Sequence, residues 1–478
     1  AIGGVINIIT DDVKNAINVS SDTRYASKGR FTQSVNIDVN TGKFGSYTSY
    51  RRQQAEGWQL NPYEENSKTH ELEETGKVAS TGFYANTVNQ KFTFDATDKL
   101  SFYARGGYYD NKTRRPYEAY DYNILHETFN YGIGAQYMIN KGNYITADCY
   151  ADHFSSSYCF FKDNKTYNGK AGEEQVRKRT RNHNLSIKGI FKLGNRHKLS
   201  VGTEYIVDVL KSQTDNIAKE DAYTLALFAQ DEIKLLRNLQ ALIGVRYIYH
   251  ENFKNHATPN VALMYKPGKF NFRASYAAGF RTPTLSELYA TDIAKKNDRL
   301  TIGNLDLKPE KNNYFSLSAE YVHERFSVSV NAFYNNIRDM IDYNTIATGD
   351  KAMEQYGHKE VRQRDNIAEA KVHGINVSAN AYLGAGFNLS GGYTHLNTQD
   401  VELEQPIDKS IKNAYNINAQ WAHSWKIYRL NINLNGRFNS KRFSKSYGYA
   451  PEYQLWDLNT RHSFNSVSYT HLRAHETK

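Results

Sequence analysis

The sequence has no long apolar run. A transmembrane helix needs roughly 20 consecutive apolar residues. No stretch of the 478 residues approaches that length, and the mean hydropathy is −0.70. Membrane spanning by helices is therefore excluded. Spanning by strands is not excluded, because barrel strands carry their lipid-facing residues in alternation with polar ones.

Cysteine is nearly absent. Only Cys149 and Cys159 occur, so the chain has neither a disulfide framework nor the cysteines for a zinc cluster. The two thiols are spaced either to pair across a loop base in an oxidising compartment or to stay free. No predicted function depends on them in either case.

Motifs of the common enzyme classes are also missing. The chain contains no His-Glu-x-x-His zinc motif, no Gly-x-Ser-x-Gly elbow and no phosphate-binding Gly-x-x-x-x-Gly-Lys loop. We therefore predict a protein that is not an enzyme, with no metal and no cofactor. The net charge is +10, but no basic run is dense, which favours solvated surface charge over nucleic-acid binding.

Aromatic residues, by contrast, are abundant. The 37 Tyr and 23 Phe, against 8 Pro and 4 Met, favour strands over helices. Apolar and polar residues alternate from about residue 15 to residue 464. Between Tyr428 and Phe438 every second residue is apolar or glycine, and the residues between them are Arg or Asn. One face of such a strand suits lipid and the other suits water.

The connections come in two kinds that alternate along the chain. Short turns, most of them with Gly, Asn, Asp or Lys, alternate with longer polar stretches. This order puts the turns at one end of the strands and the long loops at the other, as in outer-membrane barrels. We count about twenty strands and predict an all-β, transmembrane, antiparallel β-barrel. The predicted turns are 41–43, 97–99, 140–142, 194–196, 266–268, 323–325 and 384–386, and the loops are 53–83, 110–126, 155–175, 211–221, 280–311, 342–364, 398–410 and 438–451.

Two other protein classes have alternating strands. A passive porin shares nearly the same rhythm of turns and loops, so it stays as the alternative function. A soluble multi-blade β protein that binds glycans should repeat about every 40–50 residues and should not separate turns from loops. This sequence meets neither of those conditions.

Several segments resemble the TonB-dependent receptors of the outer membrane. Residues 1–10 look like the closing strand of that family's plug domain. The segment from Tyr276 to Glu310 is similar to the family's Phe-Arg-Ala-Pro and Asn-Pro-Asn-Leu-Lys-Pro-Glu boxes, with Thr282 and Leu305 as departures. The matching positions are Gly3, Gly4, Asn7, Phe280, Arg281, Pro283, Glu287, Leu288, Tyr289, Asn304, Leu307, Pro309, Glu310 and, in a later signature, Gly374.

The resemblance implies a division into domains. Residues 1–10 correspond to the C-terminal end of the plug and residues 11–466 to the barrel. Residues 467–478 resemble translated sequencing-adapter sequence, and we interpret them as a non-native tail. Family barrels have about 22 strands and hold the plug in the lumen, so we expect a fragment that lacks most of the plug and the last strands.

The resemblance also implies a function in the outer membrane of Gram-negative bacteria. Receptors of this family bind a scarce ligand at the extracellular loops and plug, and the TonB-ExbB-ExbD complex then pulls on the plug. Haem receptors of the family carry a His between the two boxes, and none lies between Phe280 and Pro309. The expected ligand is therefore an iron-siderophore complex or cobalamin. Outer-membrane lipids and lipopolysaccharide are the other expected partners.

Ligand contacts are expected on the long loops, where rigid aromatic side chains and Arg give contact area at modest entropic cost. An arginine pair suits a carboxylate or an anionic chelate. Packing within the loops and contact with lipopolysaccharide explain the same residues equally well. We interpret Arg281 and Glu310 as structural, tying the wall to a loop or to the plug. The candidate ligand contacts are Trp58, Tyr63, Arg114, Arg115, Tyr117, Tyr120, Tyr122, Tyr158, Phe160, Phe161 and Lys162.

A barrel without its closing strands has two open edges, and lipid cannot satisfy their backbone groups. Expressed as printed, the chain should therefore not reach a heat-modifiable, protease-resistant form in the outer membrane. Gel mobility with and without heating tests this, and robust assembly would contradict the expectation that strands are missing.

Overall fold

A computed structural model describes residues 16–59, 63–66, 69–74, 78, 80–117, 120–294, 298–445, 448–464 and 473–476. Among them, 23 strands form one sheet. Three of these, β16, β17 and β27, have only 4 residues each, which leaves 20 long strands that build the wall. The wall strands are β1 (Ile17–Ala26), β2 (Arg30–Asn40), β3 (Phe44–Ala55), β6 (Gly82–Asp95), β7 (Leu100–Arg114), β8 (Tyr122–Asn140), β9 (Asn143–Phe160), β10 (Glu174–Leu193), β11 (His197–Ser212), β12 (Ile217–Leu236), β13 (Leu239–His250), β14 (Lys254–Tyr265), β15 (Phe270–Arg281), β18 (Glu310–Val322), β19 (Phe326–Thr348), β20 (Glu360–Gly384), β21 (Phe387–Asp400), β22 (Asn413–Ser424), β23 (Tyr428–Asn439) and β26 (Tyr453–Phe464).

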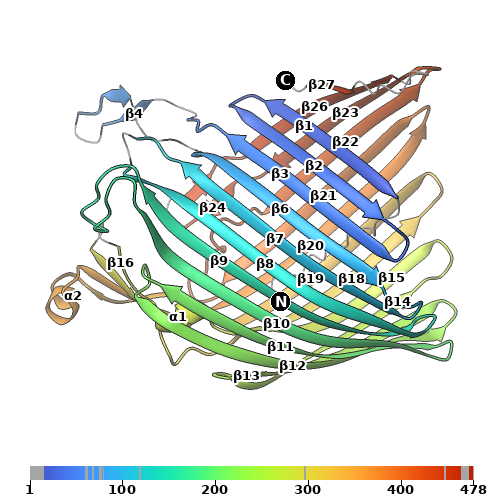
Figure 1. Ribbon diagram of the computed structural model, residues 1–478, viewed down its shortest axis with the longest axis horizontal. Coiled ribbons are helices and arrows are strands. Elements are labelled where there is room, and N and C mark those ends of the chain that lie inside the picture. The colour runs from blue at the N-terminus through green and yellow to red at the C-terminus, as the bar shows by residue number, and fades with distance from the viewer. Residues whose placement is uncertain are drawn as a thin grey trace.

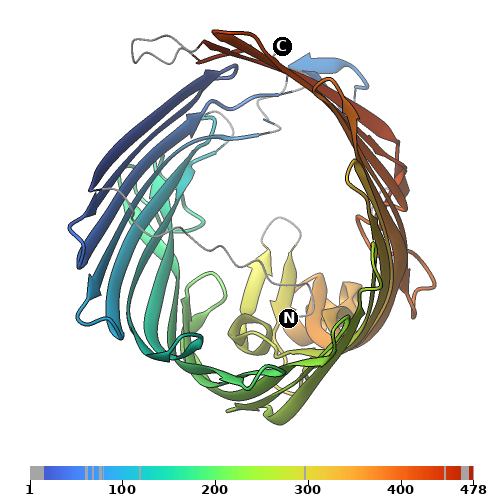
Figure 2. The same cartoon turned by 90° about the vertical axis from the view of Figure 1, so that its right-hand side faces the viewer.

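Each wall strand pairs antiparallel with the next wall strand along the chain. Figure 2 shows the resulting ring, with the dark blue β1 and the red-brown β26 at its two edges. Beyond β26, the short β27 (Arg473–Glu476) pairs with Thr460–Ser463. Within the described residues no pairing joins β1 to β26. The predicted fold class and the count of about twenty strands are confirmed.

The two faces of the wall differ as the alternation predicts. On β10 and β11 the exposed apolar residues Leu185, Ile187 and Tyr205 share one face. On the opposite face Asn182 donates a hydrogen bond to Asp208 at 2.7 Å. A polar inner face and an apolar outer face suit a lumen and a bilayer.

Figure 1 shows the strands tilted and packed side by side, with the small extra elements gathered at one end. These are β4 (Tyr63–Glu65), β5 (Leu72–Glu74), α1 (Leu285–Tyr289), α2 (Gly349–Tyr356), β24 (Arg442–Ser444) and β25 (Gly448–Ala450). All lie within connections that we predict as long loops, so the separation of turns and loops is confirmed. We call this end the mouth.

Three short connections, residues 237–238, 251–253 and 425–427, were not anticipated from the sequence. The first and third lie at the turn end, whereas 251–253 joins β13 to β14 at the mouth. Pairing between β14 and β15 begins only at Asn260 and Ala277. Above that point β14 pairs with β13 alone and β15 with β18 alone.

Two loops fold together at the mouth. In the first, residues 282–309, the strands β16 (Thr291–Ala294) and β17 (Arg299–Ile302) form a hairpin. The second loop extends β20, which pairs parallel with β17. Leu300, Ala352 and Val361 make a buried cluster between them. Figure 2 shows the yellow β16–β17 hairpin projecting inside the ring.

No helix in the described part of the chain has the length and apolarity to cross a membrane. Residues 1–15, with Gly3, Gly4 and Asn7, lie outside the described residues, as does most of 467–478. The proposed plug segment and the non-native tail therefore stay predictions.

Placing Arg at Ile187, on the lipid face, should lower the free energy of unfolding by up to about 4 kcal/mol, since such a charge costs about 2–4 kcal/mol at the bilayer midplane and less towards the interfaces. The neighbouring Ser186→Arg faces the lumen and should cost little. Urea unfolding in phospholipid vesicles, with the complete receptor, measures both. Equal losses would show that the two faces are misassigned.

Candidate functional site at the mouth

Arg281, the last residue of β15, holds two carboxylates at once. Its Nε and Nη2 donate to the two oxygens of Glu310 at 2.8 and 2.5 Å. Its Nη1 and Nη2 donate to the two oxygens of Glu287 at 2.9 and 3.2 Å. The planar guanidinium suits such paired contacts. Arg281 therefore ties the barrel wall to helix α1.

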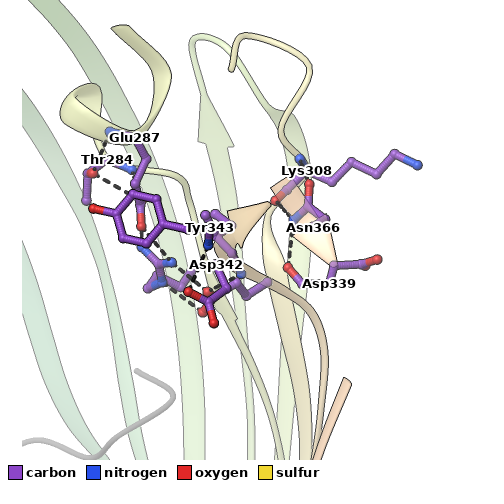
Figure 3. A network of polar contacts seen from close by, with 10 residues as sticks. Thr284, Glu287, Lys308, Asp339, Asp342, Tyr343 and Asn366 are labelled. Atoms are coloured by element: carbon purple, nitrogen blue, oxygen red, sulfur yellow. Dashed lines mark hydrogen bonds and ion pairs between the residues drawn. The ribbon is translucent and has the colours of Figure 1, made fainter. Parts of the chain in front are cut away.

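Glu287 also caps its own helix. Its carboxylate accepts from the backbone N–H of Thr284 at 2.8 Å, and the Thr284 hydroxyl accepts from the N–H of Glu287 at 3.2 Å. Figure 3 shows the two residues side by side. Burial disfavours the charged form of Glu287, but hydrogen bonds from Arg281 and Thr284 outweigh it and hold its pKa below the ordinary value.

A second clamp closes the other end of the first mouth loop. The Asn366 side chain accepts from the backbone N–H of Lys308 at 2.7 Å and donates to the carbonyls of Lys308 and Asp339 at 2.9 and 2.6 Å (Figure 3). Glu310 accepts a further bond from the N–H of Ile341 at 3.0 Å. The loop is thus fixed at both ends to neighbouring strands.

An apolar cluster lies beneath these polar contacts. Leu288, Leu307 and Ile341 are buried together, and Phe253 and Tyr289 pack against them. Leu288 and Tyr289 belong to α1, and Leu307 belongs to the second resembling box. The cluster explains why both boxes carry apolar residues, because Leu288 and Leu307 pack the first mouth loop against the barrel wall.

The seated loop completes a small polar cavity of about 150 Å³. The Nε of Arg299 is buried there and has no partner within the described residues. Arg364 lies 3.5 Å from the centre of the Tyr343 ring and donates to its hydroxyl at 2.6 Å. The lining residues are Asp215, Ser286, Ala290, Asp292, Arg299, Thr301, Ile302, Gly303, Tyr343, Arg362 and Arg364. We call this cavity the arginine pocket.

Two carboxylates face the arginines of this pocket. Asp215 accepts from Lys178 at 3.4 Å and from the Ser286 hydroxyl at 3.2 Å. Burial, with the nearby charge of Asp215, raises the pKa of Asp292. Arg362 is already paired with Glu360 at 2.5 Å. With Lys178 and Glu360 counted, the cations in and around the pocket exceed the carboxylates by one, which favours an anionic group. No residue of the pocket was predicted as a ligand contact.

Most of the predicted aromatic contacts come together in a separate group between β7 and β10. Tyr122 stacks on Tyr158 with ring centres 4.1 Å apart, and Phe160 lies 5.6 Å from Tyr122. Tyr117 stacks on Phe161 at 5.4 Å. We call these residues, with Arg115, Tyr120, Lys162, Tyr167 and Arg177, the aromatic cluster.

Cations lie over the rings of the aromatic cluster. Arg115 is 4.5 Å from the ring centre of Tyr120 and 5.0 Å from that of Tyr122. The Lys162 ammonium lies 4.0 Å from the ring centre of Tyr117. These contacts are cation–π pairs, which are strongest when water is excluded.

Sequence reasoning missed two members of this cluster. Tyr167 lies edge-on to Tyr158, with ring centres 5.1 Å apart. It is a tyrosine within the predicted 155–175 loop, so the criterion used for the other aromatic contacts could have identified it. Arg177 lies 5.0 Å from the ring centre of Tyr167. It sits at a register shift between Val176 and Lys178, which simple alternation does not reveal.

Three predicted ligand contacts lie elsewhere. Trp58 and Tyr63 belong to the connection between β3 and β6, where the backbone N–H of Trp58 donates to Ser80 at 3.0 Å. Arg114 ends β7, exposed, opposite Gly82. Their role in ligand binding stays a prediction.

The remaining positions of the resembling boxes are structural in the wall and loop. Phe280 stacks on His256 with ring centres 4.4 Å apart. A side chain at Gly374 would come within 2.3 Å of the His395 carbonyl, so only glycine lets the two strands approach. Pro283 precedes α1, and Asn304 donates its backbone N–H to Glu287 at 3.1 Å.

Replacing Arg281 by Met should lower the free energy of unfolding of the mouth by about 3–5 kcal/mol, because it leaves two poorly exposed carboxylates without a cation. The matched control is Arg338→Met, which breaks an exposed pair 3.9 Å from Glu369 and should cost at most about 1 kcal/mol. Amide exchange across 282–309 measures both. Equal protection in the two variants would contradict the clamp.

The clamp should also weaken in acid. The pKa of Glu287 is lower in the folded state, so its stabilisation is complete above the unfolded pKa, near 4.3. That stabilisation is lost as pH falls through the lower folded value. Relative to the intrinsic rate at each pH, the protection of the Leu285–Tyr289 amides from exchange should therefore fall below about pH 4 in the native protein. The Glu287→Gln variant, already weakened, should show a flatter dependence, and an unchanged dependence would refute the assignment.

Solved structures share this architecture. A mutant ferric enterobactin receptor of Pseudomonas aeruginosa superposes with a TM-score of 0.81 at 14% identity, covering 98% of this chain and 75% of that one. A siderophore receptor of Acinetobacter baumannii gives a TM-score of 0.74 at 14% identity, covering 96% and 76%. At these identities the likeness shows the fold.

A sequence relative also matches part of the chain. A probable haemoglobin and haemoglobin-haptoglobin-binding protein of Haemophilus influenzae is 28% identical over 165 residues, which is 32% of this chain and 16% of that protein. Residues 28–474 match the family described as TonB dependent receptor-like, β-barrel. The chain therefore belongs to the TonB-dependent receptor family and forms the β-barrel that these receptors place in the bacterial outer membrane.

Proposed function

We propose that the protein takes up an anionic iron-siderophore complex, which binds at the mouth of the barrel. The arginine pocket is the observation that carries this proposal. Three guanidinium groups converge on a cavity at the mouth, and the Nε of Arg299 is buried there without a partner within the described residues. A carboxylate or catecholate oxygen in the cavity would be held by charge-assisted hydrogen bonds from the guanidinium groups that line it.

The aromatic cluster adds a second surface of suitable chemistry. Its stacked tyrosines present flat rings, and Arg115, Lys162 and Arg177 lie over them. Aromatic and cationic side chains together suit an iron chelate that has aromatic arms and negative charge. The solved relatives named as ferric enterobactin and siderophore receptors fit this choice. Cobalamin remains the second ligand candidate.

Haem is the less favoured ligand, although one relative is named for haemoglobin binding. No His lies between Phe280 and Pro309, where haem receptors of the family carry one. A haem ligand would need an axial donor. The arginines and tyrosines of the mouth are instead suited to the organic part of a chelate.

Transport itself would follow the family's scheme. Ligand bound at the mouth would contact the plug, and the TonB-ExbB-ExbD complex would pull on that plug to release the ligand inward. A passive pore is the alternative. The match of residues 28–474 to the receptor family supports the energised receptor over an open channel, and Figure 2 shows the β16–β17 hairpin inside the ring.

Changing Arg299 and Arg364 together to Gln should weaken binding of a ferric siderophore by at least about 100-fold, since each charge-assisted hydrogen bond contributes roughly 1.5–3 kcal/mol and about 1.4 kcal/mol corresponds to a factor of ten. Binding is measured by fluorescence quenching with the complete receptor. Growth of a deletion strain on limiting ferric siderophore should fall in parallel and should require TonB.

The matched control is Arg325→Gln in a turn at the opposite end of the barrel, which should change neither binding nor growth. Growth on cobalamin, tested in the same strains, distinguishes the second ligand. Leakage of small solutes without TonB would identify a passive pore. Full binding by the double variant would contradict the role of the arginine pocket.

A further inference from the structure

A second cavity lies on the inner face of the wall, at the turn end of the barrel. Its volume is about 750 Å³, and residues from β10 through β15, β18 and β19 line it. Lys198 lines this cavity and lies an even number of residues from Asp208 on β11, so the two side chains share one face of the strand. The hydrogen bond between Asn182 and Asp208 belongs to the inner face. We call this cavity the lower cavity.

Small side chains form the floor of the lower cavity. Ala262, Ser275 and Ser316 lie directly opposite one another on β14, β15 and β18, and the two hydroxyl oxygens are 2.7 Å apart. The longer side chains of Lys198 and Arg273 also line the cavity. Because the floor residues are short, the wall is hollowed at this point and leaves room for a ligand.

Three carboxylates near the lower cavity already have partners. Glu232 lies 3.1 Å from the Lys198 ammonium, and Glu320 lies 3.7 Å from the Arg273 guanidinium. The third, Asp231, lies on the opposite face of β12 and contacts a histidine at 2.6 Å. None of the three is therefore left to balance a further cation of the cavity.

Three further cations line the lower cavity, and none of them has an ion pair in the part of the chain that the structure describes. They are the exposed side chains of Lys192, Arg196 and Lys234, which we call the lower cation group. Lys192 lies directly opposite Lys198 on β11, and like charges that face each other across a strand pair are destabilising. The backbone N–H of Lys234 donates to the carbonyl of Arg196 at 2.8 Å, which holds these two residues side by side.

The two ends of the lumen hold an anion in different ways. The arginine pocket at the mouth has three guanidinium groups, whose planar forks fix oxygen atoms in pairs. The lower cation group has two ammonium groups, which are point charges on flexible stems. An anion is therefore attracted to the lower cavity but is oriented less firmly there, which suits release more than retention.

We propose that the lower cavity is an exit site, where the lower cation group receives the anionic chelate after the plug has moved and before the chelate enters the periplasm. This inference rests on the proposed function and adds a second site to the path of the ligand. The volume of about 750 Å³ lies within the roughly 300–1,000 Å³ typical of ligand pockets. The three unpaired positive charges match a chelate that carries negative charge. Short turns of such barrels face the periplasm, so the cavity lies where the ligand leaves.

The first experiment separates binding from uptake in cells that express the complete receptor, with a radio-iron-labelled tris-catecholate siderophore as the probe. Changing Lys192, Arg196 and Lys234 together to Gln should leave binding in energy-depleted cells unchanged. TonB-dependent uptake should slow by about tenfold, because a cleft lined by charge of one sign raises the local concentration of an opposite ion by that factor or more. The matched control should keep full uptake, and it changes to Gln three exposed cations of turns that do not line the cavity, Lys43, Lys99 and Lys426.

Heat-modifiable gel mobility verifies that each variant is folded. A native receptor that neither binds nor takes up the probe would contradict the proposed function itself. With that function intact, native uptake by the folded triple variant would overturn the exit site. A loss of binding as large as the loss of uptake would also overturn it, because the lower cavity would then not be a separate site.

A second measurement leaves every charge in place, so it applies even if the triple variant does not fold. A photoreactive benzophenone residue in place of Gln240, which lines the lower cavity, should capture the labelled siderophore in energised cells but not in cells without TonB. The same residue in place of Leu317, which is exposed on β18, should capture none in either case. Capture of a plug segment in place of the siderophore in energised cells would overturn the proposal, as would equal capture with and without TonB.

Discussion

The structure depends on the need to satisfy every backbone N–H and C=O group without water. In the hydrocarbon of a bilayer, a chain made of β-strands satisfies these groups by pairing each strand with its neighbours in one continuous sheet. Twenty strands pair in sequence order, each with its neighbours along the chain. Because pairing between strands satisfies the backbone hydrogen bonds, the side chains can differ between the two faces of the wall.

The mouth depends in turn on one arginine. Arg281 lies at the point where the wall becomes loop, and its guanidinium makes four hydrogen bonds to Glu287 and Glu310. The loop that it holds supplies Ser286, Asp292 and Arg299 to the arginine pocket. The Arg281 clamp and the arginine pocket are therefore parts of the same folded loop.

The sequence predicts the wall well and the mouth less well. Alternation and turn residues identify the faces and most of the connections, since both are local properties. The turns at 237–238 and 251–253 contain neither glycine nor proline, and Asn238 and Asn252 alone did not distinguish them from the strands that they join. The capping box of Thr284 and Glu287 signals helix α1 in the sequence, but an otherwise all-β rhythm obscures it.

The candidate site shows where local reasoning ends. The aromatic cluster was largely foreseen, because most of its members come from two neighbouring predicted loops, 110–126 and 155–175, which are rich in Tyr and Phe. The structure corrects the bounds of these loops, since Tyr122, Tyr158 and Phe160 lie at the mouth ends of β8 and β9. The arginine pocket was not foreseen, because Asp215, Arg299 and Arg364 come from three different connections and meet only after the parallel pairing of β17 with β20. Resemblance to a family marked the clamp residues but not the cavity that they complete.

The late start of pairing between β14 and β15 gives the wall a seam. Above Asn260 and Ala277 no ladder joins these two strands, and the space between their ends is filled by His256 on Phe280 and by Phe253 against α1. Side-chain contacts yield by sliding, whereas a ladder yields only by breaking hydrogen bonds. The barrel therefore has a compliant joint beside its clamped loop, and a load on that loop is absorbed there before it reaches the rest of the wall.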